Sequence, residues 1–220
     1  MLTLAKSIGI SPEFKCYNTL ITDEWRQTVL DRHNELRRRL SDGKVKGSDG
    51  MLPTAGNINM LKWDCQMEML IDMTIGECNA DTAIPPPVQP DPYGVAKEMV
   101  HITGNEKCNA SSLAKDTLNK WWKEGAAKQK VDRKVVTIDS FTQMAYAKIV
   151  GFACSYRRCG GNFFLVCFYN KTPIKKRVLY VLPKARACDK CEKYPDNTGN
   201  RVECENFLCQ YPLTPGEILS

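Results

Sequence analysis

The sequence predicts an α+β fold with a small cysteine-rich appendage, on the basis of three observations. Apolar residues recur at helical spacing in the first part of the chain. From about residue 147 the pattern changes to aromatic and β-branched runs that are typical of strands. From residue 185 onward, Cys, Asp, Asn and Pro dominate and large apolar residues are few. Helices followed by an antiparallel sheet favour a layered α+β domain.

Three helices are expected before the sheet. The first covers about residues 23–40, with Thr22 as its N-cap and one apolar stripe along its length. His33 lies on that stripe, where a hydrogen-bonded core histidine is expected rather than a metal ligand. The second helix is expected over about 64–77, and the third from residue 111 or 112 to about 127.

The sheet is expected to begin with a hairpin. The runs "KIVGFACSY" and "NFFLVCFYN" read as strands, and "RRCGG" between them is a turn signal. "RVLYVLP" is a candidate for a further strand. The proline-rich stretch "AIPPPVQPDPYG" predicts an extended surface loop, and "VAKEMVHI" after it is expected to form a short helix or turn.

Cysteine usage indicates an oxidising compartment. Eleven cysteines are spread along 220 residues, which favours a disulfide framework. A zinc site is the alternative, because Cys188 and Cys191 form a CxxC that is followed by Cys204 and Cys209. That site would leave seven cysteines without a role in a reducing cell. An odd count leaves one cysteine unpaired or bonded between chains.

Composition and sequons agree with secretion. Asn109 and Asn170 begin Asn-x-Ser/Thr sequons, so both are expected glycosylation sites. The N-terminus lacks the unbroken apolar core of a signal peptide, so we expect a mature chain whose leader has been removed. No apolar run approaches the ~18 residues of a membrane span, so the protein is not expected to cross a membrane.

A net charge of +6 arises partly from the clusters 37–39 and 175–177. Neither cluster has the interleaved aromatic residues of a single-strand binder, so no nucleic-acid partner is expected. A solvated basic face is the favoured interpretation, and acidic glycans or lipid headgroups are alternative partners.

Candidate catalytic groups are few. The chain has only two histidines, and no common hydrolase or phosphate-binding motif occurs. Glu124 follows a pair of tryptophans, so it is either half-desolvated with a raised pKa or simply an exposed helical glutamate. Glu98 and His101 have a spacing that could seat a metal on one helical face, although two ligands alone are a weak signal.

Several segments resemble one family when they are taken together. "VLDRHNELRRRL", "LKWDCQMEMLIDMTIGEC", "AKEMV", "LNKWWKE", "DSFTQMAYAKIVGFACSY" and "FFLVCFYN" occur in that order. The family pattern G-H-F-T-Q-x-x-W appears here as "DSFTQMAY" at 139–146. The chain resembles the CAP superfamily (cysteine-rich secretory, antigen 5, pathogenesis-related 1) over about 22–183. It looks most like a venom allergen-like or activation-associated secreted protein of a parasitic nematode, and the four-cysteine tail resembles the family's hinge.

The resemblance implies a three-layer α-β-α sandwich with a central antiparallel sheet and a short cysteine-rich hinge. It divides the chain into an N-terminal extension (1–21), a CAP domain (22–184) and a hinge-like tail (185–220). It also suggests disulfides from Cys65 to Cys154 and from Cys159 to Cys167. Two crossed bonds are expected among the last four cysteines: Cys188, Cys191, Cys204 and Cys209. One further bond is left to the remaining cysteines: Cys16, Cys78 and Cys108.

Typical family members hold a divalent metal with two histidines and two glutamates. Glu98 and Glu124 match the two glutamates by position, whereas Ser140 replaces one histidine and the other, expected just after Cys78, is absent. Two carboxylates and a hydroxyl are a poor donor set for zinc. The departure therefore predicts no catalytic residue, no tight zinc binding and no other cofactor.

The resemblance implies a secreted, monomeric, non-enzymatic protein that binds sterols or fatty acids and acts between parasite and host. The alternative function is immunomodulation by binding a host protein, without a lipid role. The residues that would contact a lipid are not indicated by the sequence.

Overall fold

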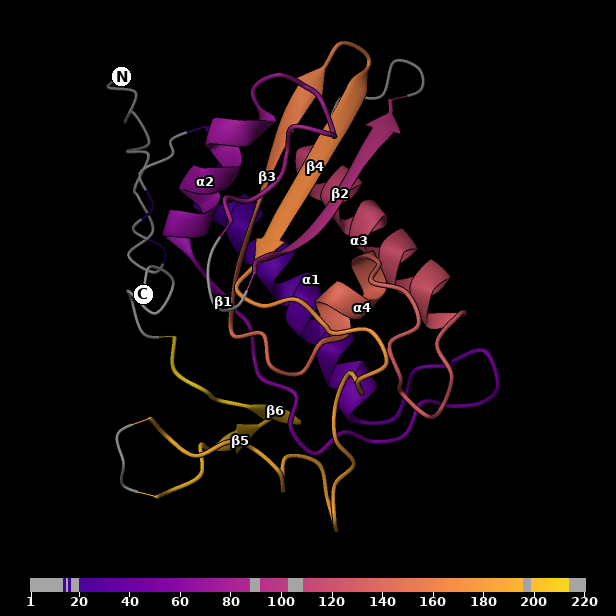
Figure 1. Ribbon diagram of the computed structural model, residues 1–220. Coiled ribbons are helices and arrows are strands. Elements are labelled where there is room, and N and C mark those ends of the chain that lie inside the picture. Colours follow the sequence, from indigo (N-terminus) through magenta and orange to yellow (C-terminus); the bar gives the residue numbers. More distant parts are fainter. Residues whose placement is uncertain are drawn as a thin grey trace, which may run out of the picture.

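The computed structural model describes residues 14, 16, 20–87, 92–102, 109–195 and 199–213. Among these residues, six helices and strands precede a long β-hairpin, and the cysteine-rich tail follows it (Figure 1). The helices are α1 (Asp23–Ser41), α2 (Cys65–Ile75), α3 (Ala110–Ala126) and α4 (Ser140–Ala145). The strands are β1 (Lys62–Trp63), β2 (Gly94–His101), β3 (Gly151–Cys159), β4 (Asn162–Tyr169), β5 (Cys204–Glu205) and β6 (Leu208–Cys209).

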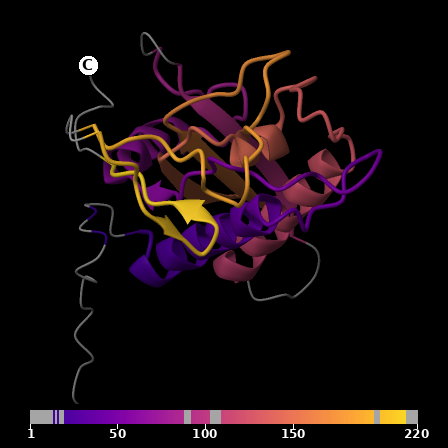
Figure 2. The ribbon, with the colours of Figure 1, turned by 90° about the horizontal axis from the view of Figure 1, so that it is seen from below.

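The central sheet lies between helical layers. Its strand order is β1-β3-β4-β2, and β5 and β6 form a separate ribbon in the tail. Helices α1 and α3 lie behind the sheet and α2 lies in front of it, as Figures 1 and 2 show from two directions. The fold is therefore the α+β sandwich that was predicted. One detail differs, because β1 pairs with β3 in parallel and the sheet is mixed rather than purely antiparallel.

Each long helix begins at a residue suited to cap it. The Thr22 side chain accepts a hydrogen bond from the Trp25 N–H, and Asp64 and Asn109 cap α2 and α3 in the same way. No helix among the described residues combines the length and apolarity that a membrane crossing requires. The predicted helix boundaries agree with these elements to within about two residues, the usual uncertainty at frayed ends.

Two predicted elements were wrong. "VAKEMVHI" forms β2, an eight-residue strand that pairs with β4 along its length, rather than a helix or turn. "RVLYVLP" does not form a strand; its Val178 makes only an isolated antiparallel bridge to Lys134. In both places pairing with distant segments, which local sequence does not reveal, decides the conformation.

Five disulfides link the described residues. They join Cys16–Cys65, Cys78–Cys159, Cys154–Cys167, Cys188–Cys204 and Cys191–Cys209. The expected bonds Cys65–Cys154 and Cys159–Cys167 are therefore wrong. The register of the hairpin explains the difference, since it sets Cys154 directly opposite Cys167, whereas Cys159 lies opposite Asn162. Both Cys16 and Cys78 are bonded, and Cys108 lies outside the described residues.

Buried polar groups connect the layers. Arg37 on α1 is fully buried and donates to the backbone carbonyls of Asn59, Met144 and Tyr146. Burial lowers the pKa of this guanidinium to about 9. A ring of carbonyl acceptors thus replaces water around the charge and ties α1 to the chain that leads from α4 into β3.

Candidate functional site

The block at 139–146 forms α4 and marks one side of the candidate site. Asp139 and Thr142 make a capping box, with Asp139 Oδ1 2.8 Å from the Thr142 N and Thr142 Oγ1 2.9 Å from the Asp139 N. Ser140 is therefore the first helical residue of α4 and is half-buried. The segment is a short helix, and only at Gly151 does the following strand begin.

Two close contacts fix α4 in its place. Phe141 packs directly on Gly125 of α3, where an added Cβ would lie 2.1 Å from the Phe141 Cβ. Gln143 lies against Gly94 of β2, where an added Cβ would lie 2.0 Å from its amide nitrogen. Gln143 is fully buried, and its Nε2 also donates to the Lys171 carbonyl over 2.6 Å. These glycines are required because a helix and a side chain approach their backbones closely.

Glu98 on β2 faces α3, and its carboxylate is already occupied. One oxygen accepts a hydrogen bond from the Trp121 Nε1 at 2.5 Å, and the other forms an ion pair with the Lys120 ammonium. The pair raises the pKa of Lys120, first through the hydrogen bond that Lys120 donates to Glu98 and then through the negative charge of Glu98. A cation supplied by the chain itself therefore neutralises Glu98.

Of the other candidates, Glu124 shares Lys120 with Glu98, whereas His101 lies on the opposite face of the sheet. Glu124 is exposed on α3, so of the two alternatives for this residue the exposed helical glutamate applies. It contributes a favourable charge to Lys120, one helical turn away. His101 lies three residues beyond Glu98 on a strand, so the two side chains point to opposite faces of the sheet. His101 Nδ1 instead contacts Asn162 Oδ1 at 3.0 Å.

The donor set does not fit a zinc ion. In the described part of the chain, donor atoms of His, Cys, Asp or Glu come together in two groups of three. One group is His33, Cys154 and Cys167, and the other is Cys188, Cys191 and Cys209. Every cysteine in these groups is bonded in a disulfide and offers no thiolate. Neither Glu98 nor Glu124 belongs to such a group, and Ser140 adds only a neutral hydroxyl.

His33 is a core residue, away from this site. It is fully buried, with Nδ1 2.9 Å from the Val29 carbonyl and Nε2 3.0 Å from the Tyr169 hydroxyl. Because a carbonyl only accepts, Nδ1 carries the proton and Nε2 accepts from Tyr169. Burial is the main cause that lowers the His33 pKa to about 3, so the imidazole is neutral and structural.

A second feature, which the sequence did not indicate, is a groove between α1 and α3. It has a volume of ≈ 350 Å³ and an apolar floor formed by Leu36, Val45, Trp122 and Ala126. Its rim carries five basic residues: Arg32, Arg39, Lys44, Lys46 and Lys123. Arg32 donates to Asn119 across the two helices, and Lys44 pairs with Asp42. The rim residues come from three separate segments, so their convergence was not visible in any one stretch of sequence.

Fold, disulfides and the α4 block together define the class of protein. Residues 30–169 match the cysteine-rich secretory protein family, CAP. Because this match covers more than half of the chain, the protein belongs to the CAP family.

Individual members of the family, among them secreted proteins, are similar to this chain in sequence or in fold. The chain is 33% identical to Ancylostoma secreted protein of Ancylostoma caninum over 204 residues, 89% of this chain but 45% of that protein. The crystal structure of Na-ASP-1 aligns over 92% of this chain and 49% of that one, with a TM-score of 0.75 and 28% identity. This chain thus spans about half the length of both relatives. The structure of NaASP2 with Zn²⁺ covers 89% of this chain and 100% of that one, with a TM-score of 0.66; at 21% identity it shows likeness of fold alone.

Proposed function

We propose that this chain is a secreted, non-enzymatic venom allergen-like protein of a parasitic nematode that binds an apolar ligand and acts between parasite and host. The similarity to Ancylostoma secreted protein and the five disulfides support a nematode origin and an extracellular location. The engaged carboxylate of Glu98 supports the non-enzymatic part, because a group held by Lys120 and Trp121 is poorly placed to accept a proton.

The groove between α1 and α3 is the observation that carries the ligand proposal. Its apolar floor suits an acyl chain, and its basic rim suits a carboxylate at the mouth. Lys46, Lys123 and Arg39 are exposed on that rim. A charged rim favours a fatty acid over a sterol, whose single hydroxyl gains little from several cations. The volume of ≈ 350 Å³ lies near the lower end of the range for ligand pockets.

Equilibrium binding of labelled palmitate and labelled cholesterol tests the proposal. We expect saturable palmitate binding that becomes about tenfold weaker in Arg39→Gln/Lys123→Gln, because each of the two rim cations contributes about 0.7 kcal/mol to a partly exposed ion pair and about 1.4 kcal/mol is a factor of ten. Arg157→Gln/Arg158→Gln is the matched control, since this exposed pair lies at the β3–β4 hairpin end. Absence of saturable binding of either lipid would overturn the proposal and favour a function through contact with a host protein.

A further inference from the structure

The positive charge of the protein is concentrated in two segments that pair with each other. Residues 128–138 and 171–178 together contain eight Lys or Arg and one Asp, a net charge of +7. The whole chain carries +6, so all its other residues together carry one net negative charge. We call these two segments the basic face. Figure 1 shows both in the lower right part of the molecule, below α3 and α4.

Backbone hydrogen bonds join the two segments. The Val135 N–H donates to the Arg177 carbonyl over 2.8 Å, and the Leu179 N–H donates to the Arg133 carbonyl over 3.0 Å. An antiparallel bridge sets Lys134 opposite Val178, which places their side chains on the same side. Residues that are about 40 positions apart in the sequence are therefore neighbours in the basic face.

Buried side chains hold the basic face from behind. The Gln129 Nε2 donates to the carbonyls of Lys130 and Lys134, each over 3.1 Å, and Gln129 itself is 5% exposed. Val135 is buried, and the Arg133 guanidinium lies 5.8 Å from the centre of the Tyr180 ring. The outward side chains are thus displayed by an anchored backbone.

The basic face also carries exposed aliphatic side chains. Val136 is 75% exposed and Ile174 is 59% exposed. Three further aliphatic residues in the same segments are partly exposed, namely Val131, Ile138 and Val178. The exposure of aliphatic groups to water is unfavourable. A polyanion such as a sulfated glycan needs only the cations and would leave these aliphatic groups in water. A partner that binds both the cations and the aliphatic side chains must have negative charge at its surface and an apolar layer beneath it.

We infer that the basic face docks the protein onto the surface of a phospholipid bilayer that contains anionic lipids. Lys and Arg near such a surface are attracted to the lipid headgroups, and small aliphatic side chains enter the boundary between headgroups and acyl chains. This inference does not depend on the groove or on a ligand bound there. It assigns a peripheral, reversible attachment, which requires no membrane-spanning helix.

The experiment measures co-sedimentation with phosphatidylcholine vesicles that contain or lack phosphatidylserine, at low and high ionic strength. The full chain is produced in the bacterial periplasm, where disulfides form and Asn170, which adjoins the basic face, carries no N-glycan. We expect binding only with phosphatidylserine, and weaker binding at high salt because the charges are screened. The double reversal Lys175→Glu/Arg177→Glu should weaken binding about 30-fold or more. The neutral pair Val136→Ser/Ile174→Ser should weaken it about tenfold.

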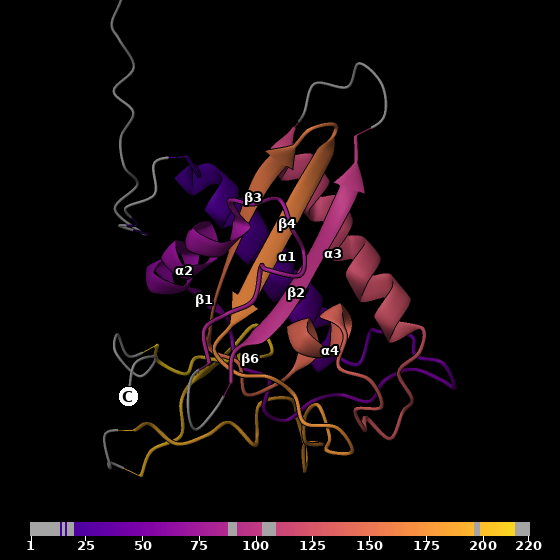
Figure 3. The same ribbon diagram turned by 45° about the horizontal axis from the view of Figure 1, so that its top comes forward.

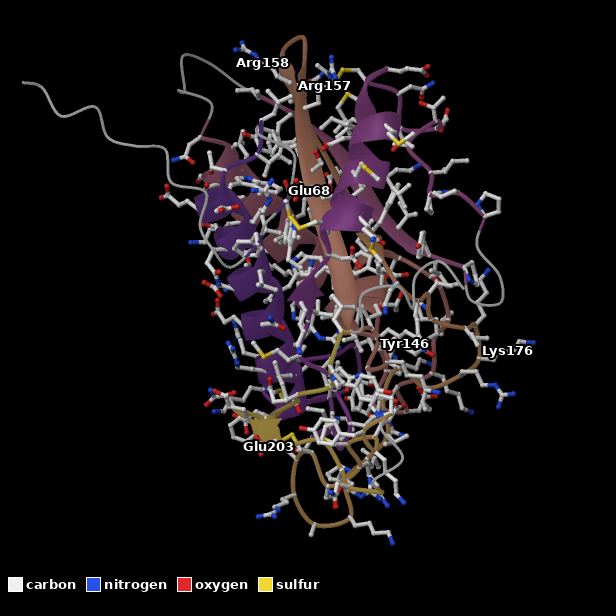
Figure 4. All side chains as sticks on the ribbon, turned by 90° about the vertical axis from the view of Figure 1, so that its left-hand side faces the viewer. Glu68, Tyr146, Arg157, Arg158, Lys176 and Glu203 are labelled. Atoms are coloured by element: carbon white, nitrogen blue, oxygen red, sulfur yellow. A yellow bond between two sulfur atoms is a disulfide. The ribbon has the colours of Figure 1, made fainter. Side chains whose placement is uncertain are left out.

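Two matched control variants test whether the loss of vesicle binding is specific to the basic face. Arg157→Glu/Arg158→Glu makes the same charge change at the top of the molecule in Figure 4, far from Lys176, which lies on the right-hand side of that view. Met69→Ser/Met73→Ser removes apolar side chains that are 55% and 76% exposed on α2. Both controls should bind within about threefold of the unchanged protein.

Three results would overturn the inference. The first is absence of phosphatidylserine-dependent binding, and the second is equal weakening by the control pair of arginines, which would indicate a nonspecific effect of net charge. The third is full vesicle binding by Val136→Ser/Ile174→Ser, which would show that the aliphatic groups do not enter the bilayer. Tight binding to heparin without vesicle binding would assign the basic face to a sulfated glycan instead. Unchanged melting temperatures confirm that each variant is folded.

Discussion

The buried ion pair between α1 and α2 offers a sharp test of how this fold is stabilised. Glu68 is 1% exposed and Arg26 is 3% exposed. Arg26 Nε lies 2.7 Å from one Glu68 oxygen and Arg26 Nη2 lies 2.6 Å from the other, a two-point contact. The Trp63 Nε1 donates to Glu68 as well, over 2.7 Å. Burial alone would lower the Arg26 pKa, but the bonds to Glu68 and Asp23 outweigh it and raise the pKa.

Replacing Glu68 by leucine should leave a buried guanidinium that has lost its two-point partner and keeps its ion pair with Asp23. Loss of one partner of a buried pair costs about 3–5 kcal/mol. Asp23 retains an ion pair with Arg26 and is 15% exposed, so we expect a loss at the lower end, about 3 kcal/mol. For a chain of this size that corresponds to a decrease of about 6–12 °C in the melting temperature.

Thermal unfolding followed by circular dichroism, with the disulfides intact, measures the effect. The double variant Arg26→Met/Glu68→Leu should recover most of the lost stability, because neither charge is then buried alone. Glu35→Leu is the matched control, since its pair with Arg32 is 53% exposed on the glutamate side and should contribute below about 1 kcal/mol. If Glu68→Leu and Glu35→Leu destabilise equally, the assignment of the pair as a buried stabilising contact is wrong.

Three further predictions follow from the site and the core. The His33 pKa is lowered to about 3, so as the pH falls the unfolded chain binds a proton before the folded chain does. The free energy of unfolding should therefore fall by about 2 kcal/mol between pH 7 and pH 5. Denaturant midpoints at the two pH values measure this loss, and His33→Gln should abolish it. Calorimetric titration with zinc should give no sub-micromolar site, and such a site that vanished in Glu98→Ala/Glu124→Ala would contradict this. Asp139→Ala should lower the unfolding free energy by about 1 kcal/mol, and an unchanged midpoint would show that the capping box is dispensable.

The arrangement of α3, α4 and β2 in Figure 3 explains why the candidate site depends on tertiary packing. Helix α3 runs beside β2, with α4 at the lower end of both. Glu98 therefore meets Lys120 and Trp121 only because β2 is the edge strand next to that helix. The sequence indicated both glutamates and the absent histidines, but it did not indicate that a lysine of this chain would occupy the carboxylate.

The sequence by itself determined the helices and strands whose apolar residues repeat with the period of a helix or a strand. The apolar stripe and the Thr22 cap predicted α1, and the aromatic and β-branched runs predicted the β3–β4 hairpin. The block at 139–146 was one of the segments that together pointed to the family, and several of its residues make specific close contacts. Gln143, for example, packs on Gly94 and bonds to Lys171 at the same time.

Tertiary structure decided everything that depends on which segments become neighbours. The conformation of β2 was set by its pairing with β4, although its sequence reads equally as a helix or turn. The disulfides followed the register of the hairpin, which opposes Cys154 and Cys167 and leaves Cys159 for Cys78. The groove rim and the basic face likewise collect residues from separate segments. Side-chain period is a local property of the chain, whereas register and neighbourhood come from packing that buries apolar surface across the whole domain.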